Sequence, residues 1–249
     1  MKSGVSPSQL LASLAEPFTG EALFDALPDV VFFIKNSRGE YVVVNRTLVE
    51  RCGLRDKREL LGRRADEVFP APLGANFRAQ DERVIRNGEA ILNQLELHFY
   101  PAGGRGWCVT NKLPLCSPAG PVVGVAGISR DLQTANERSD DYAQVAKALG
   151  QIQSRFDEPL KVKELARQAG LSEYQFEQRI RKIFQITPGQ LIQKVRMDAA
   201  VRLLRDTAKA VAAIAQECGY SDQSAFARQF RQTTGLSPVE YRRTFRAAG

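Results

Sequence analysis

Hydrophobic and polar positions follow different patterns in the two halves of the chain. Up to residue 132, apolar residues come in short runs such as 30–34 and 122–126, which are typical of strands. Between these runs, residues 48–61 and 77–86 carry apolar side chains at every third or fourth position, as helices do. The predicted order is two strands, two helices and three strands, so we expect residues 20–133 to form a mixed α and β domain.

The rest of the chain is predicted to be helical. Residues 134–147 are polar with sparse apolar positions at helical spacing, which predicts a helical connector between two domains. In residues 148–249 the apolar positions recur at intervals of three and four, and no run alternates with a period of two. Residues 1–19 are predicted to be a helical extension. The expected class is therefore α+β, with an all-α domain at the C-terminus.

An internal repeat divides the helical domain. The segment LARQAGLS at residues 165–172 returns as IAQECGYS at residues 214–221. Each copy contains a glycine that can adopt the left-handed conformation that ends a helix, Gly170 or Gly219. A side-chain oxygen then caps the next helix, from Ser172 in the first copy and from Ser221 or Asp222 in the second. A helix, a tight turn and a capped helix make the helix-turn-helix pattern, whose second helix enters the major groove of DNA.

The distribution of charge is consistent with a polyanionic partner for this domain. Residues 1–140 carry 17 basic and 17 acidic side chains, whereas residues 141–249 carry 18 and 11, so the second part holds the whole net charge of +7. A basic surface on so small a unit favours binding to nucleic acid. A solvated basic face without a partner is the alternative that charge alone leaves open.

The motif IAQECGYSDQSAFARQFRQTTGLSPVEYRR at residues 214–243 resembles the C-terminal signature of the AraC/XylS family of bacterial transcription regulators. The resemblance continues through KELARQAGLSEYQFEQRIRKIFQITPGQLI and RMDAAVRLL and covers residues 145–246. It implies two recognition helices held on one linker helix, which enter successive major-groove segments about one turn of DNA apart. Gln185 stands where the family usually has a glycine, so we expect a less tight turn after the first recognition helix.

The resemblance also implies which side chains meet DNA. The base-reading positions of the family correspond to Tyr174, Glu177, Gln178, Gln223, Ser224 and Arg228. Arginine bonds guanine, glutamine bonds adenine and glutamate accepts from cytosine, so these residue types suit the role. Further basic side chains are candidates for phosphate contacts, or else are solvated charges: Arg179, Arg181, Lys182, Lys194, Arg196, Arg231, Arg242 and Arg243.

The first half resembles the PAS sensor family over residues 20–133. The resemblance rests on PDVVFFIKNSRGEYVVVN at its start and on SRDLQ around Asp131, which is similar to the family's signal-transmitting exit motif. It implies a five-stranded antiparallel sheet with helices that close a small cavity. PAS domains variously bind haem, flavin, small organic molecules or nothing. Cys52 lacks the sequence context of the flavin-reactive cysteine, so a photoreceptor is not expected.

Strand alternation predicts which side chains reach the cavity. Leu95, Leu97 and Phe99 share one face of a strand and His98 lies on the other, so we expect His98 to point away from the core, which disfavours haem. On the next strand, Asn111 is the polar residue on an apolar face that includes Trp107. A buried amide needs a partner, and a bound metabolite, a backbone group or a structural water would each supply one. We therefore name Asn111, with Trp107 as an apolar wall, as candidate ligand-binding residues.

The cysteines and the single histidine provide no motif for a metal or cofactor. Cys52, Cys108, Cys116 and Cys218 contain no C-x-x-C pair, so we expect neither a zinc site nor a disulfide framework. Two alternative functions use these thiols. One is cysteine-based alkyl-transfer DNA repair, which would need a zinc-bound four-cysteine cluster, and the other is redox sensing through Cys108 and Cys116.

These observations predict a non-enzymatic, sequence-specific DNA-binding transcription regulator whose PAS domain senses a small molecule or mediates dimerisation. No cofactor is expected, and a small-molecule effector is a candidate partner of the PAS domain. The expected partners are double-stranded DNA and a second copy of the chain, and RNA polymerase is a further candidate. No apolar stretch approaches the roughly 20 residues that cross a membrane, and no targeting segment is recognised, so we expect a cytoplasmic protein.

Overall fold

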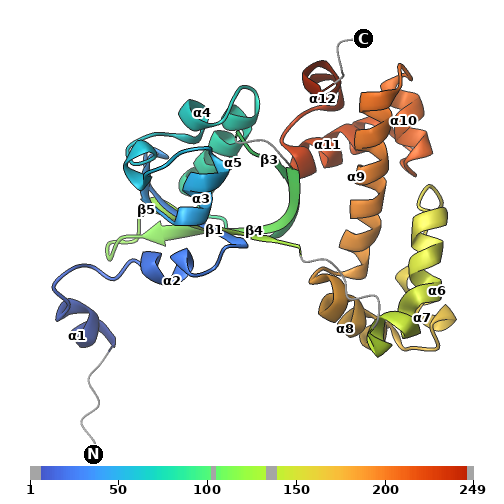
Figure 1. Cartoon of the computed structure of the whole chain (residues 1–249), viewed down its shortest axis with the longest axis horizontal. Helices are drawn as coiled ribbons and strands as arrows, with labels where there is room; N and C mark the ends of the chain where they lie inside the picture. Colours follow the sequence, from blue (N-terminus) through green and yellow to red (C-terminus); the bar gives the residue numbers. More distant parts are fainter. Residues whose placement is uncertain (1–6, 102–104, 133–138, 246–249) are drawn as a thin grey trace, which may run out of the picture.

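The computed structural model describes residues 7–101, 105–132 and 139–245 and divides into a sheet-containing half and a helical half (Figure 1). The first half, here called the sensor half, contains α1 (Pro7–Ala12), α2 (Glu21–Asp25), β1 (Val30–Asn36), β2 (Tyr41–Val44), α3 (Arg46–Arg51), η1 (Lys57–Glu59), α4 (Ala65–Val68), α5 (Leu73–Asn87), β3 (Ile91–Phe99), β4 (Arg105–Cys116) and β5 (Val122–Asp131). The second half, called the helical half, contains α6 (Asp140–Ser154), α7 (Val162–Gln168), α8 (Glu173–Phe184), α9 (Pro188–Asp206), α10 (Val211–Glu217), α11 (Gln223–Thr234) and α12 (Pro238–Phe245).

The sensor half is built on one five-stranded antiparallel sheet with the strand order β2-β1-β5-β4-β3. This confirms the predicted sequence of strands and the α+β class. Helices α3, α4 and α5 cover one face, which we call the inner face, and enclose an apolar core there that includes Val31, Phe33 and Leu60. The predicted helix at 48–61 is instead two short pieces, α3 and η1, because Gly53 interrupts it in a left-handed conformation (φ 73°).

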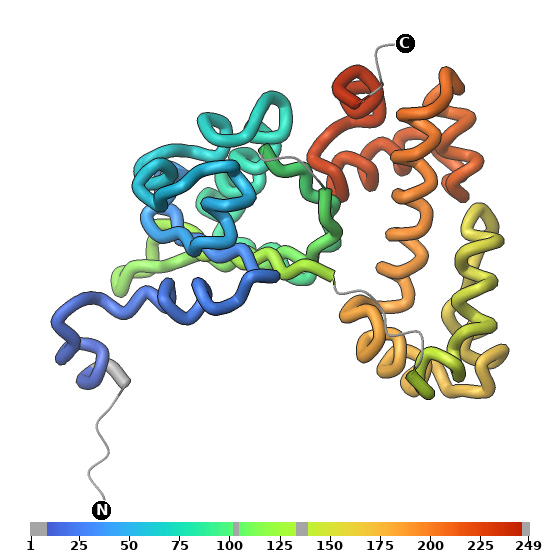
Figure 2. Tube along the Cα trace, viewed as in Figure 1, coloured from blue at the N-terminus to red at the C-terminus, as the bar shows by residue number. Residues whose placement is uncertain are grey.

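The helical half consists of two similar units joined by the long helix α9 (Figure 2). One unit contains α7 and α8, the other α10 and α11, which confirms the order expected from the repeat. Helix α6 packs against the first unit, because Val145, Ala148 and Ile152 are buried in the same cluster as Phe176. The expected boundary between connector and DNA-binding domain, at residues 147 and 148, therefore falls inside α6. Residues 134–138 of the expected connector lie outside the described residues.

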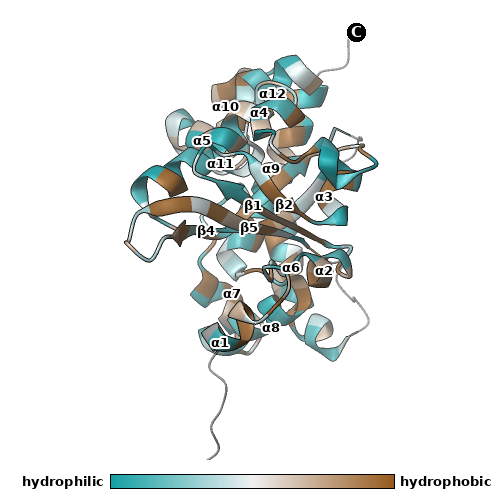
Figure 3. Ribbon diagram, turned by 90° about the vertical axis from the view of Figure 1, so that its left-hand side faces the viewer, coloured by the Kyte–Doolittle hydropathy of each residue, from teal (hydrophilic) through white to brown (hydrophobic). Residues whose placement is uncertain are grey.

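The two halves are packed against each other through the outer face of β3 and β4. Leu97 and Phe99 belong to the apolar core of the second helical unit, and Leu95 and Val109 belong to that of the first. The ring of Phe99 stacks on Phe245 with centroids 4.7 Å apart. Figure 3 accordingly shows the strands as a hydrophobic band between groups of helices above and below. Within the described residues, no helix is both long and apolar enough to cross a membrane.

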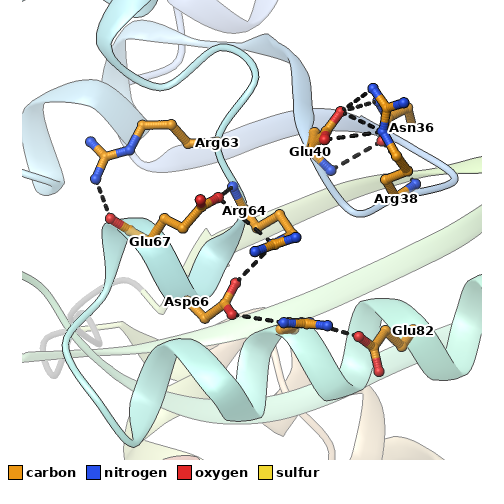
Figure 4. Close-up of polar contacts among 9 residues, drawn as sticks. Asn36, Arg38, Glu40, Arg63, Arg64, Asp66, Glu67 and Glu82 are labelled. Atoms are coloured by element: carbon orange, nitrogen blue, oxygen red, sulfur yellow. Dashed lines mark hydrogen bonds and ion pairs between the residues drawn. The ribbon is translucent and has the colours of Figure 1, made fainter.

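Several charged side chains on the surface of the sensor half are paired with one another (Figure 4). Arg78 of α5 bonds Asp66 at 2.9 Å and Glu82 at 2.6 Å, and Arg38 bonds Glu40 at 2.7 Å in the turn between β1 and β2. Such exposed pairs contribute little to stability. Their consequence is electrostatic, since a basic group that is neutralised by a near neighbour attracts a polyanion only weakly.

Candidate nucleic-acid interface and sensor cavity

Each helical unit contains the turn and cap that its sequence predicts. Gly170 and Gly219 have φ values of 68° and 77°, so both glycines adopt the left-handed conformation. Ser172 Oγ accepts a hydrogen bond of 3.2 Å from the backbone N–H of Gln175 at the start of α8. In the second unit the cap is Asp222 rather than Ser221, because its carboxylate accepts from the backbone N–H groups of the first turn of α11. Both second helices therefore begin at a fixed point.

The second helix of each unit separates a buried face from an exposed one. Phe176 and Ile180 of α8, and Phe226 and Phe230 of α11, are completely buried. Tyr174, two residues before Phe176 and therefore on the opposite side of α8, keeps 72% of its surface exposed. The remaining base-reading candidates are half-buried or exposed: Glu177, Gln178, Gln223, Ser224 and Arg228. Because the apolar face of each helix is buried, these polar side chains lie on the face that points outward.

The basic side chains named for phosphate contact have different surroundings. Arg196 is half-buried and donates hydrogen bonds of 2.8 Å and 2.9 Å to the carbonyls of Phe156 and Glu158, so it fixes the segment after α6 to α9. This favours a structural role for Arg196. The others are half-buried or exposed: Arg179, Arg181, Lys182, Lys194, Arg231, Arg242 and Arg243. Several already contact an acid, as Arg181 does with Glu177 at 2.8 Å, so a phosphate would have to compete with a carboxylate.

The expectation of a looser turn after α8 is wrong. Gln185 adopts the left-handed conformation (φ 60°), as Gly235 does after α11 (φ 74°). Their backbone N–H groups bond Arg181 and Arg231 at 2.9 Å and 2.8 Å, so the two turns close in the same way. A glutamine in this conformation is strained because its Cβ crowds the backbone. The Oε1 atom of Gln185 is also buried without a hydrogen-bond partner in the part of the chain that the structure describes.

Helix α11 lies beside the sensor half. The Asn76 side chain of α5 donates a hydrogen bond to the carbonyl of Gly235, and α11 contacts β3, with Gln229 and Gln232 in one surface groove with residues of that strand. A surface groove at this junction is lined by Arg228, Arg231 and Gln232 from the helical half and by Arg83 from α5. The position of the sensor therefore determines how much of this end of α11 is accessible.

The sensor half encloses a cavity of about 40 Å³ between the inner face of the sheet and its covering helices. Its walls combine apolar side chains with Lys35, Glu96, His98, Thr110 and Lys112. The expectation that His98 points away from the core is wrong, because His98 and Glu96 face the cavity while Leu95, Leu97 and Phe99 face the helical half. The cavity has room for a few water molecules and is far too small for a porphyrin.

Trp107 and Asn111 do not line this cavity. Both lie on the outer face of β4, where the Trp107 ring contacts both helical units and its Nε1 donates to Asp198 at 2.9 Å. The Asn111 amide oxygen accepts a hydrogen bond of 2.9 Å from the backbone N–H of Asn93, so a backbone group is its partner. The geometry thus opposes their expected ligand role and makes Trp107 a contact between the halves.

A cluster of buried charged side chains lies beside the cavity. Asp81 of α5 forms ion pairs with Lys35 and, at 2.6 Å, with Lys112, and all three side chains are almost completely buried. Burial by itself would raise the pKa of Asp81, but the two ammonium groups outweigh it and hold this pKa below its ordinary value. The pKa of Glu96 is about 2, because hydrogen bonds and the charge of His98 outweigh burial, and Glu96 is therefore ionised.

Hydrogen bonds connect the cavity to the end of β5. The Tyr100 hydroxyl lies 3.4 Å from His98 Nδ1 and accepts a hydrogen bond of 2.8 Å from Arg51. Arg51 in turn donates to the carboxylate of Asp131 at 2.9 Å. Asp131 belongs to the predicted exit motif. A short chain of polar contacts therefore links His98 to the segment through which the chain leaves the sensor half.

The thiols are dispersed. Cys52 and Cys218 are buried in different halves, and burial raises the pKa of each to about 12, which makes them unreactive. Cys108 is buried and Cys116 is exposed, and a separation of eight positions along β4 places them about 26 Å apart. The four cysteines therefore cannot share a zinc ion as the alkyl-transfer alternative requires, and Cys108 and Cys116 cannot pair as a redox switch within one chain.

One cluster of possible metal ligands corresponds to no motif in the sequence. Glu96, His98 and Cys108 lie within 4.8 Å of one another, measured between one donor atom of each, on the inner face of β3 and β4. The spacing of Glu96 and His98 was a visible signal, because residues two apart share a face of a strand. The third member depends on the pairing of Glu96 with Cys108 between strands, which no linear motif records.

Comparisons with known proteins agree with this division of the chain. A helix-turn-helix domain model matches residues 165–244, and a PAS fold model matches residues 24–137. The probable transcriptional regulator LumQ of Photobacterium leiognathi is 31% identical over 114 residues, and the transcriptional activator RhaR of Mannheimia succiniciproducens is 30% identical over 118. These alignments cover 46% and 47% of this chain, and 46% and 43% of those proteins, so the chain spans under half their length.

A shorter relative is covered almost completely. The regulatory protein SoxS of Salmonella typhimurium is 31% identical over 91 residues, which are 36% of this chain and 85% of SoxS. Among solved structures, the C-terminal domain of the response regulator AraT from Geobacillus stearothermophilus has 30% identity and a TM-score of 0.42, covering 44% of this chain and 92% of that one. The Vibrio VqmA–ligand–DNA complex has 25% identity and a TM-score of 0.43, with coverage of 71% and 84%.

Proposed function

The chain belongs to the AraC/XylS family of helix-turn-helix transcription regulators, and on this basis we propose that it is a sequence-specific DNA-binding regulator controlled by its own sensor half. The observation that carries the proposal is the pair of capped helices, α8 and α11, each with a buried phenylalanine face and an exposed polar face, held by α9. Such helices fit successive major-groove segments. The regulator acts in the cytoplasm, and RNA polymerase is a candidate partner through family membership alone.

Control by the sensor follows from the alternation of side chains along β3. Glu96 and His98 face the cavity, whereas Leu97 and Phe99, their neighbours in sequence, pack on the helical half. Because alternate residues of one strand point to opposite faces, a shift of β3 that accommodates a bound effector also moves its contacts with the helical half. The effector then changes the placement of α11 and its access to DNA. This is a coupling between two sites through one shared element.

Arg228→Ala tests the DNA-reading role. DNA sites are first selected from a random double-stranded oligonucleotide pool with the full-length protein, and binding is then measured on the selected site and on random DNA. We expect Arg228→Ala to weaken specific binding by about 1 to 3 kcal/mol, which is about 5- to 150-fold, and to relax the preference at one base pair. Arg243→Ala removes an exposed phosphate candidate and should weaken binding to both DNAs equally. Equal losses for Arg228→Ala would contradict base reading.

We also propose a homodimer, supported by exposed apolar side chains on the N-terminal helices α1 and α2 and on the segment between them. Leu10, Leu11, Phe18 and Leu23 each keep at least half of their surface exposed. A second copy of the chain would cover these side chains and place two pairs of reading helices on one DNA site. Sedimentation equilibrium at micromolar concentration is expected to give twice the chain mass, and Leu10→Glu together with Leu23→Glu should restore the monomer. A monomeric wild type would contradict the dimer.

A further inference from the structure

Three side chains with different ligand chemistry meet on the inner face of the sheet. Glu96 and His98 are two residues apart on β3, and Cys108 on β4 is the register partner of Glu96. One carboxylate oxygen, one imidazole nitrogen and the thiol sulfur all lie within 4.8 Å of one another. Glu96 and Cys108 are almost completely buried, and His98 keeps only 13% of its side chain exposed. The cluster is thus an interior feature, next to the cavity.

We propose that Glu96, His98 and Cys108 bind one divalent transition-metal ion of the zinc type, with the open coordination position directed into the sensor cavity. Thiolate, imidazole and carboxylate are the ligands that Zn²⁺ takes in proteins, and three protein ligands with an open position are typical of sites that exchange a fourth ligand. The inference rests on the proposed sensing function, because it names the chemical class of the effector. The effector is the ion itself or a small molecule bound to it.

Charge supports a divalent ion at this position. A buried site must be close to neutral, because an unbalanced charge inside a protein is costly. The Glu96 carboxylate and a Cys108 thiolate together balance an ion of charge +2, and His98 contributes a neutral nitrogen. Two protons leave to solvent when the ion binds, one from the Cys108 thiol as the metal–sulfur bond forms and one from the His98 imidazolium, whose charge acts on Glu96 in the metal-free protein. The neighbouring cations Lys35 and Lys112 are held by Asp81 and so do not occupy the cluster.

Hydrogen bonds around the cluster orient the ligands. Gln80 and Gln94 donate to Glu96 Oε1 at 2.9 Å and 2.6 Å, and Thr110 donates to Oε2 at 2.5 Å. Tyr100 lies against His98 Nδ1, which leaves Nε2 directed toward Glu96. Partners of this kind fix the geometry of metal ligands in known sites. The ligands are therefore positioned before the ion arrives.

Room for the ion and for its fourth ligand is also present. His98 Nε2 lies 2.8 Å from Glu96 Oε2, whereas two ligands of one tetrahedral ion lie about 3.3 Å apart at metal–ligand distances of about 2.0 Å. A small rotation of the imidazole ring opens this contact. Gln80 Oε1 lines the cavity and is buried with no hydrogen-bond partner within the described ranges. A water bound to the ion would donate to this unmet acceptor.

The test uses the full-length protein, stripped of metal with a chelator and kept reduced, and titrated with Co²⁺ alone. We expect one equivalent to bind with a thiolate-to-cobalt charge-transfer band, which Zn²⁺ then abolishes. Cys108→Ser should remove the band and weaken Zn²⁺ binding by more than about 100-fold, because loss of a ligand exceeds the 10- to 100-fold cost of losing an outer partner. The matched control is Cys116→Ser, since Cys116 is an exposed thiol on the same strand. It should change neither the band nor the affinity.

Two results would contradict the proposed metal site. A band that survives in Cys108→Ser and disappears in Cys116→Ser would place the metal at the surface, and a folded wild type that binds no Co²⁺ would overturn the proposal. If Cys108→Ser does not fold, His98→Gln serves instead, because it keeps the thiol and should still lose tight Zn²⁺ binding. DNA binding is measured separately on metal-free protein. Metal uptake without DNA binding would refute the proposed function alone, and DNA binding without metal uptake would refute this inference alone.

Discussion

Asp81→Asn is expected to lower the free energy of unfolding by about 3 to 5 kcal/mol. Asp81 is the shared counter-charge of Lys35 and Lys112, and all three side chains are buried. Removing one member of a buried ionic cluster leaves the others uncompensated, at a cost of about 3 to 5 kcal/mol. Urea denaturation followed by circular dichroism measures the loss. Glu82→Gln, at the next position but partly exposed, is the matched control and should change stability by less than about 1 kcal/mol.

The pH dependence of stability gives a second readout of the same cluster. Because the folded pKa of Asp81 lies below its ordinary value, its contribution is complete above the pKa of an unfolded aspartate, about 3.9. The contribution disappears as the pH falls through the lower folded value. Asp81→Asn should therefore lose less stability than wild type between neutral and acid pH. A variant that stays within 1 kcal/mol of wild type at neutral pH would mean that Lys35 and Lys112 are hydrated in solution.

Phe226→Ala is expected to cost about 3 to 5 kcal/mol and to remove specific DNA binding. Its ring is completely buried and lies 5.4 Å from Tyr220 and 5.6 Å from Phe230 between centroids. Truncation of a buried phenylalanine leaves a cavity at a cost of about this size. Helix α11 would lose its fixed orientation although every charged group remains. Denaturation and binding to the selected DNA site measure the two effects.

The matched control for Phe226→Ala is Val239→Ala. Val239 lies in α12 of the same helical unit but keeps 66% of its surface exposed, so its truncation should change stability by less than about 0.5 kcal/mol. Phe176→Ala tests the repeat, because Phe176 occupies the corresponding buried position in α8 and should show a loss similar to that of Phe226→Ala. Unimpaired specific binding by Phe226→Ala would mean that α11 does not read DNA.

Local patterns in the sequence were sufficient to predict the helical half. The turns at Gly170 and Gly219, the cap at Ser172 and the buried face of Phe226 all depend on residues close together in the chain. Gln185 shows the limit of such reasoning, since the surrounding helices impose a left-handed conformation on a residue that disfavours it. Which exposed side chains touch bases also stays a prediction, because exposure does not distinguish a DNA contact from a solvated surface.

The sensor cavity was predicted on the wrong face of the sheet, for a physical reason. Alternation correctly separated Leu97 and Phe99 from Glu96 and His98, but it does not say what covers each face. An apolar face is ordinarily expected to form the core of its own domain. In the structure that face is covered by the helical half, and the polar face encloses the cavity. Both faces of a strand that lies between two domains are buried. The sequence of the strand does not show which face belongs to which domain.

The difference in accessibility among the thiols provides a natural site for a spectroscopic probe. Cys116 at the end of β4 is exposed, whereas Cys52, Cys108 and Cys218 are buried. A maleimide fluorophore added to the native protein would therefore attach at one position without any substitution. From there it would report by energy transfer to labelled DNA how far the sheet moves relative to the duplex when an effector is added.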